Sequence, residues 1–320
     1  MKKFLKVLGL TLLSVAVVGC GSSQTKVEVS KENTQVTKAE NEATHTQVSD
    51  GSDVTSQASQ KAEGEERVIV GSVALVKILD ALGVKMIGVP STSYTLPDSV
   101  AEATAIGNPM SPDMEVMLSL EPTVIVALES LGEDYKTNFS SENIETLLVS
   151  LSSYEDLKET ITLLGERFGK EKEAAHIIDE FTSREASILE KVAGKESPEV
   201  MIVFGAPGNF MIATTESYVG DLVSRVGGIN IIDDTSSSFI PVNMEYLADK
   251  NPDIILTMSH ASPEVMKAVF EEEFATNELW QHFDAVKEGN VVNLDSNYFG
   301  MSADLSALDA MEMLADILYE

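Results

Sequence analysis

Cysteine, histidine and basic residues are all scarce in this chain of 320 residues, which holds one cysteine and four histidines. A single cysteine cannot form a disulfide within the chain, so the fold depends on its packed core. The chain has 22 lysines and arginines against 52 aspartates and glutamates, which gives a formal net charge of -30. Because phosphates would be repelled, this charge excludes nucleic acid as a partner. An anionic ligand would need hydrogen-bond donors placed around it.

A long transmembrane run is missing as well. The first apolar segment, "FLKVLGLTLLSVAVVGC" at residues 4–20, is shorter than the roughly 20 apolar residues of a membrane-spanning helix. Lysines around a short apolar core are typical of a secretory signal. The tetrad "VVGC" resembles a bacterial lipobox, so residues 1–20 predict a lipoprotein signal with cleavage before Cys20 and lipid attachment to it. The alternative is a plain signal peptide, which is weakened because Cys20 is the only cysteine.

Residues 21–66 show no sustained apolar period and consist mainly of Ser, Thr, Gln, Glu, Asn and Lys with scattered valines. Such a segment cannot bury enough apolar area to offset the entropy that it would lose on ordering. We therefore expect a disordered tether between the lipid and a folded domain.

From Arg67 onwards the pattern is that of an α/β protein. "RVIVGS" predicts a strand, "ALVKILDALG" a helix that ends in glycine, and "KMIGVP" a second strand. Residues 170–194 keep a helical apolar period without an internal glycine or proline, so they predict one long helix. The prediction is thus an N-terminal α/β lobe at 67–169, a connecting long helix at 170–196 and a C-terminal α/β lobe at 197–320.

An internal repeat relates the two lobes. "DMEVMLSLEPTVIVAL" begins at Asp113 and "NMEYLADKNPDIILTM" begins at Asn243, at a constant offset of 130 residues. Four identities keep this register: Met114 and Met244, Glu115 and Glu245, Pro122 and Pro252, and Ile125 and Ile255. Each copy predicts a short helix, a proline break and a buried strand, so the lobes share one design.

Met110 and His260 each stand just before a predicted helix start. In "SHASPE", Ser262 is the predicted N-cap and Pro263 the first helical residue, so His260 lies between the carboxyl end of a strand and a helix. In open α/β sheets this crevice is where ligands bind. In "GNPMSPDME", Ser111 is the predicted N-cap, and Met110 has no apolar partner for a hydrophobic staple.

One methionine and one histidine, one from each lobe, would form a soft axial pair across a cleft. Such a pair suits haem iron. It suits zinc poorly, because zinc prefers cysteine, histidine and carboxylate together. Two plainer interpretations stay open: Met110 is a packing residue, and His260 makes a local hydrogen bond near the helix start.

Nearly the whole chain after the signal resembles the haem-binding lipoproteins of Gram-positive ABC importers, of the iron-regulated surface determinant type. The matching segments are "GVPSTSYTLPDSV", "GNPMSPDME", "FGAPGNFMIATTESYVGDLVSRVGGINII", "NPDIILTMSHASPE", "NELWQHFDAVKEGNVVNL" and "YFGMSADLSALDAM". Of these, "NPMSPDME" and "SHASPE" are specific to the haem-binding type. The resemblance implies an α/β fold of two Rossmann-like lobes joined by a single long helix, the class III periplasmic-binding-protein type.

The resemblance also implies ligand roles. One haem b, iron protoporphyrin IX, is expected with Met110 and His260 as axial ligands of the iron, and Tyr298 is the reserve for Met110. Relatives commonly have glycine and methionine after the histidine, whereas Ala261 and Ser262 follow here. Backbone amides are expected to hold the propionates at Ser72, Val73 and Ala74 and at Thr92, Ser93 and Tyr94. Phe299 and Met301 either pack on the ring or form an apolar plug before the last helix.

The resemblance places the protein on the extracytoplasmic face of the cell membrane, anchored through Cys20, with haem, the membrane subunits of an ABC permease and upstream surface haem donors as partners. Glu115 and Glu245, one in each repeat copy, are expected to dock the permease, or they are ordinary exposed glutamates. No nucleophile elbow, phosphate loop or metal-hydrolase motif occurs, so we expect no enzyme. A siderophore or cobalamin receptor and a structural or adhesive lipoprotein remain the other candidates.

Overall fold

The computed structural model describes residues 66–139, 144–206, 209–247, 249–259 and 262–320. The predicted signal, Cys20 and all of the predicted tether except Glu66 lie outside the described residues, as do His260 and Ala261. Residues Ala62–Glu320 form one compact unit, which contains both predicted lobes. Among the helices that are described, none has the length and apolar character needed to cross a bilayer.

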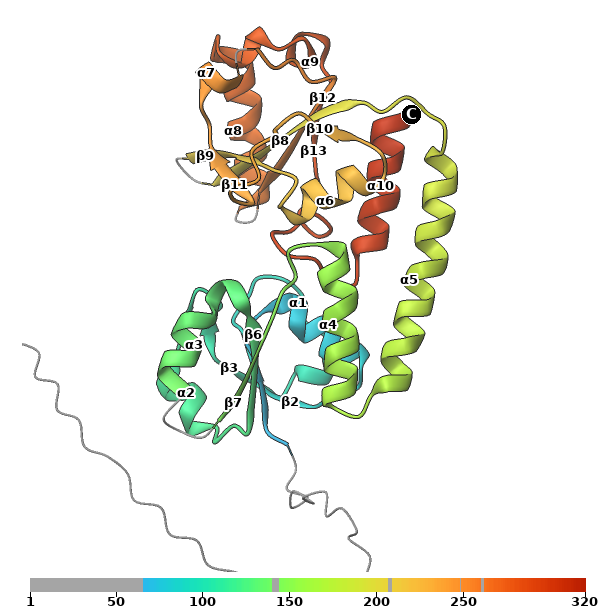
Figure 1. The fold of residues 1–320 in the computed structure, drawn as a ribbon. Helices are drawn as coiled ribbons and strands as arrows, with labels where there is room; N and C mark the ends of the chain where they lie inside the picture. The colour runs from blue at the N-terminus through green and yellow to red at the C-terminus, as the bar shows by residue number, and fades with distance from the viewer. Residues whose placement is uncertain (1–65, 140–143, 207–208, 248, 260–261) are drawn as a thin grey trace, which may run out of the picture. The chain divides into compact units, whose positions relative to one another are not determined.

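The N-terminal lobe is built on a five-stranded sheet whose strand pairs are all parallel (Figure 1). The strand order is β3-β2-β1-β6-β7. The strands are β1 (Val68–Val70), β2 (Met86–Val89), β3 (Thr104–Ala105), β6 (Val124–Leu128) and β7 (Glu145–Val149). The helices of this lobe are α1 (Val73–Ala81), α2 (Met114–Ser119), α3 (Gly132–Phe139) and α4 (Tyr154–Arg167).

Both faces of this sheet are buried, which explains why its strands are nearly continuous runs of valine and isoleucine. Val68 and Val70 of β1 face the core that is formed with α1 and α4. Ile69, between them, faces the core that is formed with α2 and α3. The alternation follows from the two-residue period of a strand.

The C-terminal lobe has a mixed six-stranded sheet with the order β11-β9-β8-β12-β13, and β10 also pairs with β8. Its strands are β8 (Glu199–Ala206), β9 (Asn209–Ala213), β10 (Ile229–Asn230), β11 (Phe239–Pro241), β12 (Ile254–Ser259) and β13 (Val291–Asn293). Its helices are α6 (Tyr218–Arg225), α7 (Met244–Leu247), α8 (Pro263–Thr276), α9 (Asp284–Glu288) and α10 (Ala307–Tyr319). β9 is antiparallel to both β8 and β11.

The predicted long helix is α5 (Glu171–Val192), with 22 residues. Its buried residues Ala174, Phe181 and Ile188 belong to a hydrophobic core that continues from α1 and α4 to α6 and α10. One face of each sheet therefore packs into a common core. The predicted α/β architecture with two lobes and one long connecting helix is confirmed.

The two copies of the repeat fold alike. The carboxylate of Asp113 accepts hydrogen bonds of 3.1 Å from the second and third amides of α2. The side-chain oxygen of Asn243 accepts bonds of 3.0 and 3.2 Å from the same amides of α7. After each proline, Thr123 and Asp253 accept a bond from the main-chain nitrogen at the start of the neighbouring strand, at 2.9 and 2.7 Å. The sequence repeat is thus a structural repeat.

The predicted N-cap at Ser111 is wrong, because Asp113 caps the helix that begins at Met114. Ser111 and Pro112 instead form a short strand, β5 (Ser111–Pro112), which pairs antiparallel with β4 (Gly107–Asn108). Gly107 supports this hairpin with a φ of 92°, a conformation that side chains disfavour. The partner strand lies upstream of the Ser-Pro pair, so the local capping pattern did not reveal it.

Candidate ligand site

The predicted site residues follow the carboxyl ends of parallel strands in both lobes. Ser72 follows β1, Thr92 follows β2, and the undescribed His260 comes directly after Ser259, the last residue of β12. Carboxyl ends of parallel strands meet at one edge of a sheet, where open α/β folds bind ligands. The topology therefore gathers Ser72 and Thr92 at one edge of the N-terminal sheet, and β12 ends with Ser259 at the corresponding edge of the C-terminal sheet.

The start of α1 is suited to an anionic group. Ser72 is the N-cap, and its hydroxyl oxygen accepts a hydrogen bond of 3.3 Å from the amide of Leu75. The first amides of a helix have no acceptor within the helix, and the helix dipole adds positive potential there. Val73 and Ala74 are only partly buried, and the first turn of α1 contains no acid. In a chain this acidic, that absence leaves the amides open to a carboxylate.

The turn after β2 is exposed at Thr92 and Ser93, and Tyr94 is partly buried. The amide of Tyr94 donates to the hydroxyl of Thr92 at 3.0 Å, which holds the turn in shape. Ser91, one residue earlier, donates its amide to the carbonyl of Gly107 at 2.8 Å. This bond attaches the turn to the β4–β5 hairpin.

Met110 lies in the turn of that hairpin and is 77% exposed. Its amide donates to the side-chain oxygen of Asn108 at 2.9 Å, so the backbone is held while the thioether stays free. An exposed methionine on a fixed hairpin does not serve the core, which removes the interpretation of Met110 as a packing residue. Asn108 was not among the predicted site residues, although the order "NPM" is typical of an Asx turn, in which its side chain holds the backbone of Met110.

Beyond His260, the chain enters α8 through an unusual cap. Ser262 is the N-cap as predicted, but its φ is 52° and its side chain makes no capping hydrogen bond. A left-handed serine is strained, and Pro263 after it begins the helix. Ser259, the last residue of β12, is buried.

The two candidate residues in the loop before α10 differ in their exposure to solvent. Phe299 is fully buried in the common core, whereas Met301 is 42% exposed. Tyr298 is partly buried and packs against the same core. Of the two side chains predicted to touch a ligand ring, only that of Met301 is accessible as the loop stands, and Phe299 forms an apolar plug.

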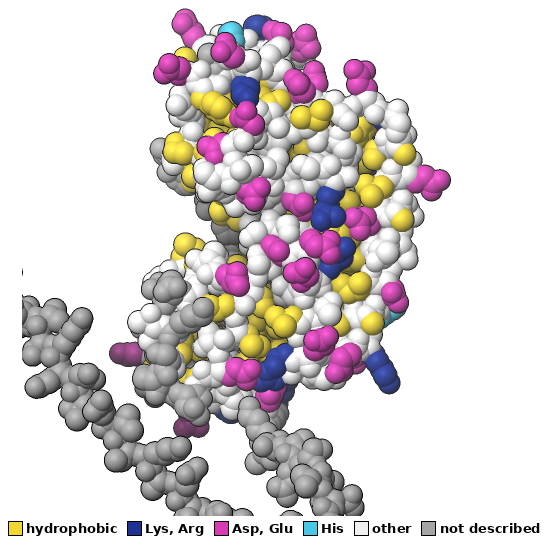
Figure 2. Space-filling model, viewed as in Figure 1, with side chains coloured by type: hydrophobic (Ala, Val, Ile, Leu, Met, Phe, Trp, Pro, Cys, Tyr) yellow, Lys and Arg dark blue, Asp and Glu magenta, His cyan; other side chains and the backbone are white. Residues whose placement is uncertain are grey.

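Glu115 and Glu245 occupy the same place in the two repeat copies. Each lies in the first turn of its helix, α2 or α7, and each is exposed. Figure 2 shows many acidic and few basic side chains on the visible face of the described residues. Within the part of the chain that is described, no three His, Cys, Asp or Glu side chains are grouped to hold a metal ion. Among the described candidate residues, Met110 and Met301 have exposed thioethers, and Met110 is the more exposed of the two.

The family model of the periplasmic binding protein matches residues 68–298. The high-affinity heme uptake system protein IsdE of Staphylococcus aureus is 35% identical over 267 residues, which is 83% of this chain and 91% of that protein. The crystal structure of S. aureus IsdE complexed with heme is similar with a TM-score of 0.76 and 35% identity, covering 80% of this chain and 100% of that one.

An ABC transporter substrate-binding protein from Listeria monocytogenes EGD-e is similar at the same level, with a TM-score of 0.76 and 36% identity over 80% of this chain and 99% of that one. These relatives are binding components of importers, which agrees with the expectation that the chain is not an enzyme. The predicted family is confirmed by the extent of the matches in sequence and in fold. The chain belongs to the periplasmic binding protein family, and within it to the substrate-binding proteins that resemble IsdE.

Proposed function

We propose that this protein is a haem receptor that binds one haem between its two lobes and delivers it to an ABC permease for iron acquisition. The observation that carries the proposal is the 35% identity, over 83% of this chain, to a protein named for heme uptake. That protein's complex with heme has the same fold along its entire chain. Met110 and His260 are the axial ligands of the iron in this proposal.

The chain's own residues are suited to this ligand. Met110 offers a thioether that nothing in the core requires, on a hairpin that Asn108 and Gly107 hold in place. The acid-free start of α1 and the turn at Thr92 offer amides and hydroxyls to the two propionates. The haem itself would supply the iron, and the protein would supply its axial ligands and hold its carboxylates.

The test is a titration of the purified full chain with haemin, followed by the Soret band. His260→Ala should abolish the wild-type spectrum and retain little haem, whereas Met110→Ala should weaken retention less, because a thioether is the softer and more replaceable ligand. His176→Ala, on the exposed side of α5, is the matched control and should behave as wild type. A wild-type spectrum from the His260 variant would refute the assignment.

A siderophore or cobalamin receptor of the same fold is the second candidate. Structures of Staphylococcus aureus SirA with staphyloferrin B and of Bacillus subtilis FeuA with ferri-bacillibactin are 21% and 24% identical to this chain, so they share its fold alone. Such ligands favour a cationic or aromatic-rich site, and the described site residues contain neither a lysine nor an arginine. Tight binding of a ferric siderophore without haemin binding would favour this candidate.

Glu115 and Glu245 are proposed to dock the lobes onto the permease by pairing with arginines on its two membrane subunits. Their equivalent, exposed places in the repeat support this role. Exposed ion pairs are each worth about 0 to 1 kcal/mol, so both must be changed together. The double variant Glu115→Gln, Glu245→Gln should bind haem normally in vitro and lose uptake in cells that grow on haem as sole iron source. Normal uptake would exclude these residues as the docking pair.

Lipid anchoring at Cys20 is proposed from the lipobox-like "VVGC". Cys20→Ala should release the protein from the membrane fraction without changing its haem spectrum. Retention of the variant in the membrane fraction would argue against a lipid at this residue.

A further inference from the structure

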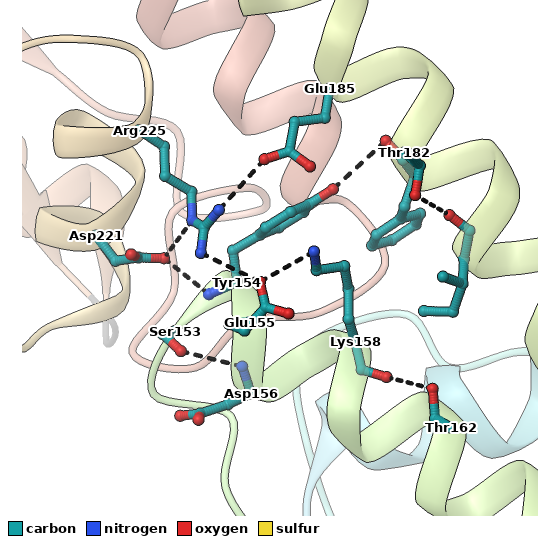
Figure 3. A network of polar contacts seen from close by, with 12 residues as sticks. Ser153, Tyr154, Glu155, Asp156, Lys158, Thr162, Thr182, Glu185, Asp221 and Arg225 are labelled. Carbon is teal, nitrogen blue, oxygen red and sulfur yellow. Dashed lines mark hydrogen bonds and ion pairs between the residues drawn. The ribbon is translucent and has the colours of Figure 1, made fainter.

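A polar cluster joins the two lobes at the connecting helix. We call it the inter-lobe cluster, and it consists of Tyr154, Glu155, Glu185, Asp221 and Arg225 (Figure 3). Its residues come from α4 of the N-terminal lobe, from α5 and from α6 of the C-terminal lobe. The mechanism proposed above uses none of them.

Arg225 is the only cation of the cluster and contacts three carboxylates on three helices. Its Nε lies 3.1 Å from Oδ2 of Asp221 on its own helix, and its Nη1 lies 3.2 Å from Oε1 of Glu185 on α5. Its Nη2 lies 3.6 Å from Oε2 of Glu155 on α4. Each of its three nitrogens thus points to a different carboxylate, whereas a lysine would offer its donors from a single nitrogen.

Tyr154 contacts the other residues of the cluster from the N-terminal lobe. Its main-chain nitrogen, the first amide of α4, donates at 2.8 Å to Oδ2 of Asp221, so a residue of one lobe satisfies a helix start of the other. Its ring is fully buried, stacks on Phe181 of α5 with centroids 5.8 Å apart, and lies under the guanidinium of Arg225 at 4.8 Å.

The charges make Arg225 necessary for the close approach of the helices. Side chains of Glu185, Asp221 and Arg225 are each at most a quarter exposed, at 17%, 22% and 25%. Glu155 is more exposed, at 53%. Like charges at partly buried sites repel more strongly than like charges in free solvent. Without the guanidinium, Asp221 and Glu185 would face each other and Glu155 with no cation between them. In the described ion pairs, Lys158 contacts only one of these three carboxylates. Its Nζ lies 3.0 Å from Oε2 of Glu155.

A second contact between the lobes lies apart from this cluster. Nζ of Lys77 on α1 pairs with Oδ2 of Asp304 at 2.5 Å, and the amide of Ala303 donates to the carbonyl of Leu151 at 2.8 Å. With this contact and α5 intact, loss of the cluster would leave the lobes joined. Their angle would then be less well defined.

We propose that Arg225 is a positioning residue that fixes the angle between the lobes, and thereby the separation of the ligand groups that each lobe contributes. The role in haem binding rests on the function proposed above, whereas the role in fixing the angle does not. None of the described contacts of Arg225 involves Met110, so we expect its effect on the ligand to pass through the relative placement of the lobes.

The experiment measures the distance between one spin label on each lobe by double electron–electron resonance. The labels go on Glu102→Cys and Lys267→Cys, both at exposed positions, in the full chain with Cys20→Ser so that no other cysteine reacts. Arg225→Met is compared with Arg167→Met as matched control. Arg167 is similarly exposed and pairs with Glu145 of β7 and with Glu66, just before the N-terminal lobe, so it makes no contact with the other lobe in these pairs.

Arg225→Met should broaden the distance distribution about twofold without haem and raise the rate of haem loss to apomyoglobin about tenfold. Arg167→Met should leave both unchanged. Arg225→Lys keeps the charge but not the three-way contact and should give a distance distribution of intermediate width. If Arg225→Met fails to fold, this variant alone tests the inference. A wild-type distribution in either Arg225 variant overturns the inference. Broadening in a protein that binds no haem upholds the fixed angle and refutes the proposed function instead.

Discussion

The N-terminal and C-terminal copies of the repeat have the same helix cap and the same strand entry, but they have different surroundings. The first copy follows the β4–β5 hairpin that presents Met110, while the second follows β11, which pairs antiparallel in a mixed sheet. At the offset of 130 residues, Met110 corresponds to Ile240, and His260 corresponds to Ser130. The two predicted ligands therefore occupy unrelated places on related scaffolds.

This difference teaches that the repeat supplies the framework and not the site. A buried strand with a capped helix is needed in each lobe for stability, so both copies keep it. In the proposed function each lobe contributes one ligand, and the predicted residues lie outside the repeated positions: Met110 in the β4–β5 hairpin and His260 directly after Ser259 in the sequence. Substitutions at equivalent positions test how far the equivalence of the two copies extends.

The largest effect is expected in the cores. Ile125 of β6 and Ile255 of β12 are both fully buried and occupy the same repeat position, but they face separate hydrophobic clusters. Ile125→Ala and Ile255→Ala should each lower the free energy of unfolding by about 2–5 kcal/mol, because each leaves a cavity. Urea unfolding followed by far-UV circular dichroism measures both.

Additivity sharpens this comparison. Because the two side chains share no partner cluster, the double variant should lose the sum of the two single losses to within about 0.5 kcal/mol. A clear deviation from the sum would show that the cores of the two copies are coupled. A loss below about 1 kcal/mol in one single variant would instead show that the copies are not equally well packed.

The caps come next. Asp113→Ala and Asn243→Ala should each cost about 1 kcal/mol of unfolding free energy, because each removes the acceptor for two amides at a helix start. Asp113→Asn is the matched control and should be almost neutral, since asparagine already performs this task in the second copy. An Asp113→Asn variant as unstable as Asp113→Ala would mean that the charge, and not the hydrogen bonds, stabilises α2.

The smallest expected effect is a difference between the two copies in how the stability of the fold depends on pH. Tyr246 donates a hydrogen bond to Asp233 near α7, whereas the first copy has Val116 at that place. This bond, the backbone amide and Lys250 hold the pKa of Asp233 below its usual range. A lowered pKa stabilises the fold above the unfolded value near 4 and loses that contribution as the pH falls through the folded value.

Tyr246→Phe should therefore remove part of this dependence. Between pH 6 and pH 3, the melting temperature of the variant should fall less than that of the wild type, by about 1 °C or less. Val116→Ala, the change at the equivalent position of the first copy, should leave the difference between the two pH values as in the wild type. An identical pH dependence in wild type and Tyr246→Phe would contradict the role given to this bond.

Local patterns predicted the framework well. The helical period at 170–194 predicted α5, and the alternation of apolar runs with capped helices predicted the α/β lobes. The repeat correctly paired Glu115 with Glu245. These features depend on neighbours in the sequence, and such neighbours are visible in the sequence itself.

Features that depend on residues outside the local pattern were not predicted. Ser111 had the form of an N-cap, but pairing with Asn108 in the hairpin made it part of a strand. Phe299 was considered as a ligand contact, although it fills the core shared by both lobes. Arg225 lies in the quoted motif "TTESYVGDLVSRVGG" and was not singled out, because its importance comes from Glu155 and Glu185, which are 70 and 40 residues away.

The starts of α2 and α7 differ in their number of negative charges, which makes the two copies of the repeat distinguishable to a partner. Asp113 and Glu115 are both acidic and exposed at the start of α2, whereas Asn243 and Glu245 provide a single charge at the start of α7. A pseudosymmetric pair of equal charges would dock on a two-subunit partner equally well in either of two orientations. In the proposed docking, the carboxylate at Asp113 would remove that degeneracy, because a partner with unequal positive charge on its two subunits could distinguish the ends.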